Sequence, residues 1–179
     1  MRVSKPIPGD IVLFKGHGFV FNIFSKLLSL LDPGWRKLKW KPWHMGIVWG
    51  RFENDLLVAE GYSPISRLHY YSTEELAECR YYRRIENIDW IKAQKFLRDY
   101  LGKRYDVQVY FWTTLGYLLR HYWGRPIKYF MDNRFSCWEF VYSFCLEMGY
   151  PLCDKFDFPM ITDFLKVEGE ICASLKRNP

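Results

Sequence analysis

The chain has few of the features that mark a secreted, zinc-binding or membrane-spanning protein. Its five cysteines include no closely spaced pair, so we expect neither a disulfide framework nor a CxxC zinc site. The opening MRVSKPIPGD lacks the apolar segment of a secretory signal. The most apolar run, residues 18–31, contains Asn22 and Lys26 and is shorter than the ~20 residues that span a bilayer. These features predict a reduced, cytoplasmic setting.

Internal repeats, low-complexity tracts and Ser/Gly-rich linkers are also missing, which favours a single domain over residues 1–179. A chain of 179 residues can bury one good core but is too short for two ordinary domains. Hydrophobic residues make up 49% and charged residues 26% of the chain, which is the balance of a globular protein and not of a disordered one.

Basic charge and aromatic side chains are both abundant, with a net charge of +6 and 20% Phe, Trp and Tyr. They occur together in residues 35–43, WRKLKWKPW. This pattern fits a solvated loop that keeps the protein soluble, an anionic membrane surface, or single strands of nucleic acid that stack on the rings. Of the two partners, we retain the membrane surface as possible and do not expect nucleic acid.

Hydrophobic periodicity divides the chain into a strand-rich half and a helix-rich half. Strands are predicted at 10–14, 45–50 and 55–61, the last two as antiparallel neighbours, with further strands in 66–71 and 80–85. Helices are predicted at 19–31, 90–101, 107–122 and 137–148, and residues 35–43 are predicted to be a loop. The fold class is therefore α+β, with an antiparallel sheet packed against helices.

Cys137, in FSCWEFV, is placed at the start of the last helix, with Asn133 and Ser136 as possible caps. A helix N-terminus favours a thiolate, and its free N–H groups can bind the oxyanion of an acyl-transfer intermediate. The alternative is that Cys137 is a small core residue, because it begins a buried stripe that continues through Phe140 and Phe144.

His44 and Glu60 lie on the two paired strands. His44 precedes the buried run MGIVW, where a rigid strand could hold it as a general base. Glu60 ends LLVAE and could orient the imidazole by accepting its second N–H. The alternatives are a strand-end histidine bonded to backbone and a glutamate that faces solvent.

Five segments in order, PGDIVLF, WHMGIVW, VAEGY, GKRYD and SCWEFV, resemble the permuted papain-like amidases of the YaeF/YiiX group, relatives of NlpC-type peptidases and lecithin–retinol acyltransferase. The resemblance covers roughly residues 8–150. It implies a circularly permuted papain-like fold in which the histidine strand precedes the cysteine helix. It also implies that Cys137 is the nucleophile, His44 the base and Glu60 the third member of a triad, and that the Tyr105 hydroxyl assists the oxyanion.

The same resemblance implies structural roles for Asp106 and Glu139. Trp138 departs from it, because relatives carry a small residue after the nucleophile. We expect Trp138 and Trp43 to contact the substrate and an aromatic helical insert at 107–135 to cover the site.

The resulting hypothesis is a thiol-dependent hydrolase that cleaves an amide, such as a cell-wall peptide or an acyl-amide, through a cysteine acyl-enzyme without metal or organic cofactor. Two alternatives remain. One is a lipid acyltransferase or esterase on the same fold, and the other is a non-catalytic module that binds membrane or nucleic acid through residues 35–43.

Overall fold

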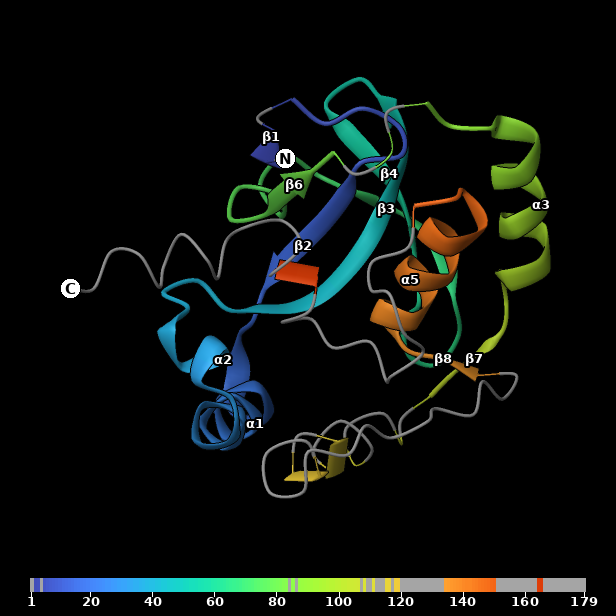
Figure 1. The fold of residues 1–179 in the computed structure, drawn as a ribbon. Helices are drawn as coiled ribbons and strands as arrows, with labels where there is room; N and C mark the ends of the chain where they lie inside the picture. Colours follow the sequence, from blue (N-terminus) through green and yellow to red (C-terminus); the bar gives the residue numbers. More distant parts are fainter. Residues whose placement is uncertain are drawn as a thin grey trace.

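The computed structural model describes residues 2–3, 5–83, 85, 87–106, 108, 111, 115–116, 118–119, 134–150 and 164–165. Within this part of the chain the fold is α+β, with a six-stranded antiparallel sheet in the order β1-β6-β2-β3-β4-β5 (Figure 1). The strands are β1 Arg2–Val3, β2 Ile11–Lys15, β3 Pro42–Phe52, β4 Asp55–Glu60, β5 Arg67–Tyr71 and β6 Arg80–Tyr82.

The centre of the sheet is the β2–β3–β4 meander, as predicted from the apolar runs of the first half. Glu53 adopts a φ of 54° in the tight turn between β3 and β4, where a short left-handed turn lets the two long strands pair directly. Alternate residues enter two apolar clusters: Leu13 and Ile47 face the main core, whereas Val12 and Val48 belong to a smaller cluster that includes Leu76. Both faces of the central strands are therefore covered.

The helices of the described part are α1 Gly18–Leu31, α2 Pro33–Lys37, α3 Trp90–Tyr100 and α5 Cys137–Glu147. Helix α5 packs between β3 and α3 (Figure 1). The ring of Phe96 on α3 contacts those of Phe140 and Phe144 on α5 at centroid distances of 5.1 and 5.3 Å. Because α5 is buried on nearly all sides, its first residue is held rigidly at the edge of the core.

Two local predictions were wrong in part. The loop predicted at 35–43 is confined to 38–41: Asp32 accepts hydrogen bonds from the N–H groups of Gly34 and Trp35 and so begins α2, and β3 already starts at Pro42. On α3, sequence spacing puts Trp90, Ala93, Leu97 and Tyr100 on one apolar face, but Trp90 is exposed and Phe96 is fully buried.

Three short strands were not predicted: β1 at the edge of the sheet, β7, Arg104–Tyr105, and β8, Arg134–Phe135. Strands β7 and β8 form a parallel pair beside the start of α5. They connect the segment after α3 directly to the residues before Cys137. Of the helix predicted at 107–122, the structure describes 108, 111, 115–116 and 118–119, and all of these except 108 are helical. Most of the insert at 107–135 lies outside the described residues.

No described helix has both the length and the hydropathy of a membrane-spanning segment.

Candidate active site

Strands β3 and β4 bring His44 and Glu60 together. His44 Nε2 lies 2.6 Å from Glu60 Oε2. The Glu60 side chain is 0% exposed and that of His44 is 14% exposed. Glu60 therefore does not face solvent, and His44 is not held by backbone groups alone: the carboxylate accepts the Nε2–H and fixes the ring tautomer.

Two further side chains complete the surroundings of the buried carboxylate. Arg67 Nε donates to Glu60 Oε1 at 2.8 Å, and the Tyr71 hydroxyl lies 3.0 and 2.9 Å from the two carboxylate oxygens. Burial by itself raises the pKa of Glu60, but the hydrogen bonds from His44, Arg67 and Tyr71 outweigh it and hold this pKa below its usual value. Glu60 is thus an anion at neutral pH.

Helix α5 begins at Cys137 because Ser136 and Glu139 form a capping box. The Ser136 N–H donates to Glu139 Oε2 at 2.7 Å, and the Glu139 N–H donates to Ser136 Oγ at 3.4 Å. Glu139 therefore has the structural role expected of it. The N–H groups of Cys137 and Trp138 occupy the first two helical positions, where no helix carbonyl can accept them. These groups and the helix dipole place positive potential at the thiol.

The end of β4 touches the start of α5 through Gly61. A Cβ atom at this position would lie 2.8 Å from the Ser136 carbonyl oxygen and 3.2 Å from the Cys137 Cα. Only glycine permits this approach without displacing backbone. The contact brings the thiol beside the imidazole, close enough for Cys137 to raise the pKa of His44. Since His44 Nε2 faces Glu60, Nδ1 is the nitrogen left for the sulfur.

The charge state of His44 follows from these neighbours. Burial disfavours the imidazolium, but Cys137 and Glu60 both favour it through charge and hydrogen bonds, and together they raise the pKa of His44 to about 9. The thiolate is the nucleophilic form of cysteine, and an adjacent imidazolium stabilises its negative charge. With this pKa His44 is an imidazolium at neutral pH, placed to stabilise a thiolate at Cys137 as it forms.

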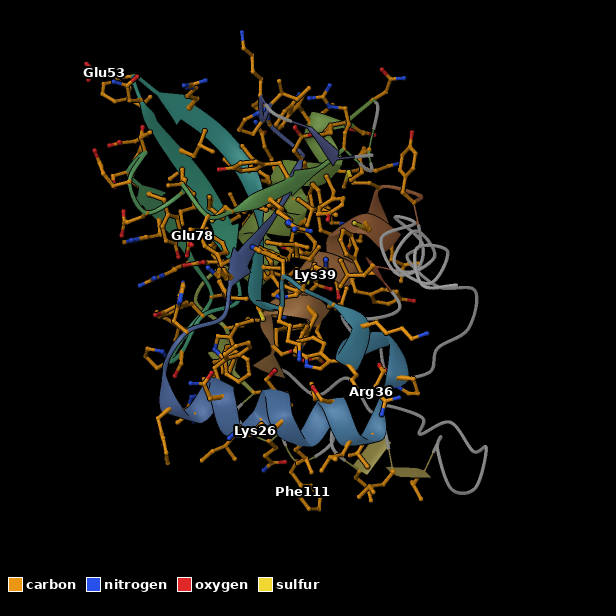
Figure 2. All side chains as sticks on the ribbon, turned by 90° about the vertical axis from the view of Figure 1, so that its left-hand side faces the viewer. Lys26, Arg36, Lys39, Glu53, Glu78 and Phe111 are labelled. Carbon is orange, nitrogen blue, oxygen red and sulfur yellow. The ribbon has the colours of Figure 1, made fainter. Side chains whose placement is uncertain are left out.

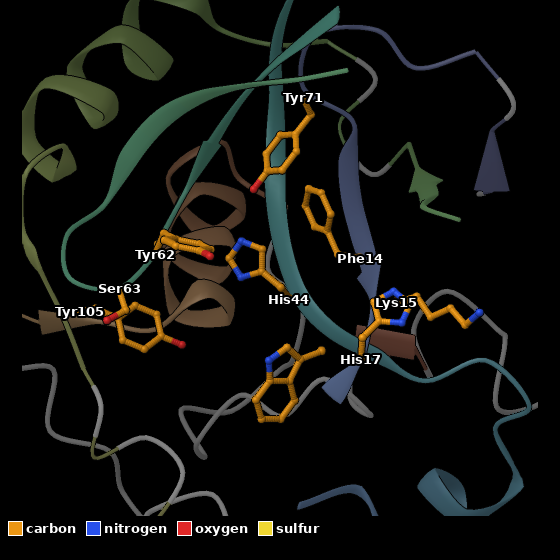
Figure 3. Close-up of a pocket in the computed structure, with 10 residues that line it drawn as sticks. Phe14, Lys15, His17, His44, Tyr62, Ser63, Tyr71 and Tyr105 are labelled. Atoms are coloured by element: carbon orange, nitrogen blue, oxygen red, sulfur yellow. The ribbon is translucent and has the colours of Figure 1, made fainter. Parts of the chain in front are cut away.

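A cavity of about 500 Å³ opens beside His44 (Figure 3). Aromatic side chains dominate its wall, and two of them position the imidazole: the ring of Phe14 lies 5.3 Å from it, and Tyr62 meets it edge-on at 5.5 Å. Arg67, the partner of Glu60, lies over the Tyr62 ring at 3.8 Å. The imidazole is therefore fixed by rings on its faces as well as by Glu60.

Tyr105 lines the same cavity (Figure 3). Strand β7 pairs it with Phe135, two residues before Cys137, and its N–H donates to the Pro64 carbonyl at 2.8 Å. The parallel β7–β8 pair thus holds Tyr105 near the start of α5, and its assistance to the oxyanion stays a prediction from the family resemblance.

The two tryptophans predicted to contact substrate lie in different places. Trp43 lines the cavity and packs edge-on against Phe21 and Phe24 of α1. Trp138 is 5% exposed, belongs to the main core and is not among the cavity-lining residues. Its position does not support a direct substrate contact, because the helix turns its side chain inward.

The aromatic side chains of residues 35–43 are occupied within the fold. Trp35 is fully buried. Trp40 donates its indole N–H to the Glu78 carbonyl at 3.2 Å, and Arg80 lies over its ring at 4.4 Å. Trp43 packs on α1. These rings are therefore poorly placed to stack on the bases of a nucleic acid.

Cys79, Cys137 and Cys145 are free thiols in the described part of the chain. Burial, followed by the nearby charge of Glu78, raises the pKa of Cys79 to about 12. Cys145 is fully buried in the core. The described part has no group of three or more His, Cys, Asp or Glu residues arranged to hold a metal ion.

Sequence reasoning missed Arg67 and Tyr71. The signal was available in principle, because antiparallel pairing of the predicted strands at 55–61 and 66–71 places Glu60 opposite Arg67. Fixing that register from the sequence requires the loop geometry at 61–66, which the pattern does not give.

A scan against protein-family models finds no match for this chain, and a search of curated proteins finds no relative.

Proposed function

We propose that this chain is a thiol-dependent hydrolase that cleaves an amide through a Cys137 acyl-enzyme. The observation that carries the proposal is the order Cys137–His44–Glu60: Glu60 is fully buried and bonded to His44, and the thiol lies at a helix N-terminus, where it raises the pKa of the same imidazole. A histidine that bridges a cysteine and a buried carboxylate is the arrangement of nucleophilic catalysis, and an ordinary core has no need of it.

In the proposed mechanism the Cys137 proton moves to His44, and the thiolate attacks the substrate carbonyl. The Cys137 N–H and the Tyr105 hydroxyl stabilise the resulting oxyanion. The imidazolium then returns its proton to the leaving amine as the C–N bond breaks, which leaves a thioester. His44 next takes a proton from water, whose oxygen attacks the thioester. The C–S bond breaks and the acid leaves, and the Cys137 sulfur recovers the proton from His44. Glu60 stabilises the imidazolium in both halves.

We also propose that the fold is a circularly permuted papain-like fold of the NlpC type. The order of the site supports it, since the histidine strand β3 comes before the cysteine helix α5 and the third residue lies on the neighbouring strand β4. The antiparallel sheet packed against the cysteine helix is compatible with it.

The cavity favours an amide with a compact or aromatic group beside the scissile bond, such as a cell-wall peptide or an acyl-amide. Its described lining comes from β2, β3, the segment 61–63, His17, Tyr71 and Tyr105; His17 directly precedes α1, but no residue of 19–31 is included. An acyl-chain channel along α1, which would suit a lipid acyltransferase, therefore has less support. The non-catalytic alternative loses support as well, because the rings of residues 35–43 are engaged internally.

A thiol-labelling experiment tests the catalytic proposal. Iodoacetamide at neutral pH should alkylate Cys137 faster than Cys79, because burial keeps Cys79 protonated, and mass spectrometry of the digested protein resolves the sites. His44→Ala should slow the labelling of Cys137 strongly. His17→Ala is the matched control, because His17 also lines the cavity but is highly exposed and lies beside Glu78. Preferential labelling of Cys79, or equal labelling in His44→Ala, contradicts the proposal.

A further inference from the structure

Helix α1 exposes an apolar face that the proposed hydrolase does not use. Five of its fourteen residues are exposed hydrophobic side chains. Their exposed fractions are 79% for Phe19, 68% for Val20, 54% for Ile23, 37% for Leu27 and 78% for Leu30.

These five side chains form one continuous strip. At 3.6 residues per turn they fall within an arc of about 100° on the helix surface. The opposite side of α1 carries Phe21, Phe24 and Leu28, which are buried in the main core. The helix is thus apolar on both sides, whereas a helix that only covers a core has a polar outer face.

Basic residues border the strip. Lys26 lies on α1, next to one edge of the apolar strip. Arg36 lies on α2, beside the C-terminal end of α1 (Figure 2). Between residues 16 and 41 the only carboxylate is Asp32, which is 9% exposed and bonded to the start of α2. The surface formed by residues 16–41 therefore carries exposed basic side chains and no exposed carboxylate from the same residues.

Figure 2 shows that α1 lies at one end of the molecule, with Lys26 and Arg36 projecting along it and Phe111 at the same end. Phe111 is 65% exposed. Exposed apolar side chains and basic side chains thus lie on the same side of the protein.

From this strip we propose that α1 docks the protein on an anionic phospholipid bilayer. The exposed side chains enter the boundary between headgroups and acyl chains, and Lys26 and Arg36 contact lipid phosphates. With 14 residues α1 is too short to cross the bilayer. It therefore lies in the plane of the interface. Charge complementarity selects this occupant, because a second copy of the chain would set the same cations against each other.

Vesicle co-sedimentation of the full chain tests the proposal. The protein should sediment with vesicles of equal parts phosphatidylcholine and phosphatidylglycerol, and much less with pure phosphatidylcholine or at high salt. The double variant Phe19→Ser/Leu30→Ser should bind about tenfold less or weaker still. Its control is Ile91→Ser/Phe52→Ser, which removes two exposed hydrophobic residues outside α1 and should bind like the wild type.

A second pair of variants tests the charges. Lys26→Glu/Arg36→Glu should weaken binding to the anionic vesicles on the order of tenfold. Lys95→Glu/Arg98→Glu makes the same charge change on exposed positions of α3 and should have a much smaller effect.

The outcomes are distinct. Absence of sedimentation with anionic vesicles, or equal binding by the α1 variants and their controls, overturns the proposal. It is also overturned if the lipid-free protein is a dimer that Phe19→Ser/Leu30→Ser dissociates, since the strip then joins two copies. Cys137 labelling should be unchanged in the α1 variants, so loss of docking and loss of thiol reactivity are separate results.

Discussion

Glu60→Gln is the most informative single substitution at the candidate site. Glutamine has nearly the same shape as glutamate but only one acceptor oxygen. His44 and Arg67 donate to different oxygens of Glu60, so one of these two donors faces the amide NH2 in the variant. The change therefore removes the negative charge beside the imidazole and one hydrogen bond, and it leaves the volume of the side chain almost unchanged.

The magnitude follows from the pKa of His44. Its rise from 6.5 to about 9 corresponds to about 3 kcal/mol of added stability for the imidazolium. Cys137 and Glu60 supply this stabilisation against the opposing effect of burial. Removing the Glu60 charge should lower the pKa of His44 on the order of one unit, or about 1.4 kcal/mol. We expect turnover of an amide substrate to fall on the order of 10²-fold, the usual size of an acid–base contribution.

The assay is the pH dependence of Cys137 alkylation by two reagents. Iodoacetate is an anion, so its reaction is favoured by the imidazolium and should decline as His44 loses its proton. Iodoacetamide is neutral and should show no such alkaline decline. In the wild type the decline with iodoacetate should be centred near pH 9, and in Glu60→Gln it should move to lower pH by about one unit. Glu75→Gln, at an exposed glutamate, is the control.

Two results would refute the reasoning. One is an alkaline decline that stays near pH 9 in Glu60→Gln, because Glu60 would then contribute nothing to the charge of His44. The other is the same decline with iodoacetamide, which would mean that it reports unfolding or another group.

Three further predictions concern the same site. Gly61→Ala should lower both the melting temperature and Cys137 labelling, because its Cβ would lie 2.8 Å from the Ser136 carbonyl oxygen. Gly50→Ala is the control and should be near neutral, because no atom lies within 4 Å of its Cβ. Equal losses of melting temperature in the two variants would contradict this. Arg67→Met should destabilise the protein by about 1–3 kcal/mol in urea unfolding, since Glu60 loses a charged partner; no change in midpoint would count against it. Because the pKa of His44 is raised, its contribution to stability is fully present below pH 6.5 and is lost as pH rises through about 9. The wild-type melting temperature should fall over this range, and that of His44→Gln should fall less; parallel curves would disprove this assignment.

The central strands and the last helix could be predicted because local pattern and tertiary burial agree there. The run MGIVW forms the buried part of β3, and DLLVAE forms β4. Cys137 begins its helix because SCWE contains both residues of a capping box, a signal that lies within four positions. The pairing of His44 with Glu60 then follows from the adjacency of two strands joined by a tight turn.

The parts that sequence reasoning missed depend on distant contacts. Strand β7 pairs with β8 across about thirty residues, and no local period marks a two-residue strand. Sequence spacing put Trp90 on the apolar face of α3 and did not single out Phe96, because packing against α5 decides which of the two is buried. The apolar outer strip of α1 was read as part of an ordinary helix, since hydrophobic residues alone do not say which face is covered.

In the ion-pair form of the proposed mechanism the charges of the site alternate in sign: Cys137 thiolate, His44 imidazolium, Glu60 carboxylate and Arg67 guanidinium. A buried charge is tolerated when it is paired, and the cost of leaving one unpaired is several kcal/mol. If the proton returns from His44 to Cys137, the first two groups become neutral together, and Arg67 still balances Glu60. The net charge of these groups is therefore the same before and after proton transfer. Glu60 can be a fully buried carboxylate because β5 places Arg67 directly opposite it. The register of β4 with β5 is therefore as necessary to the charge balance of the site as the residues that contact the thiol.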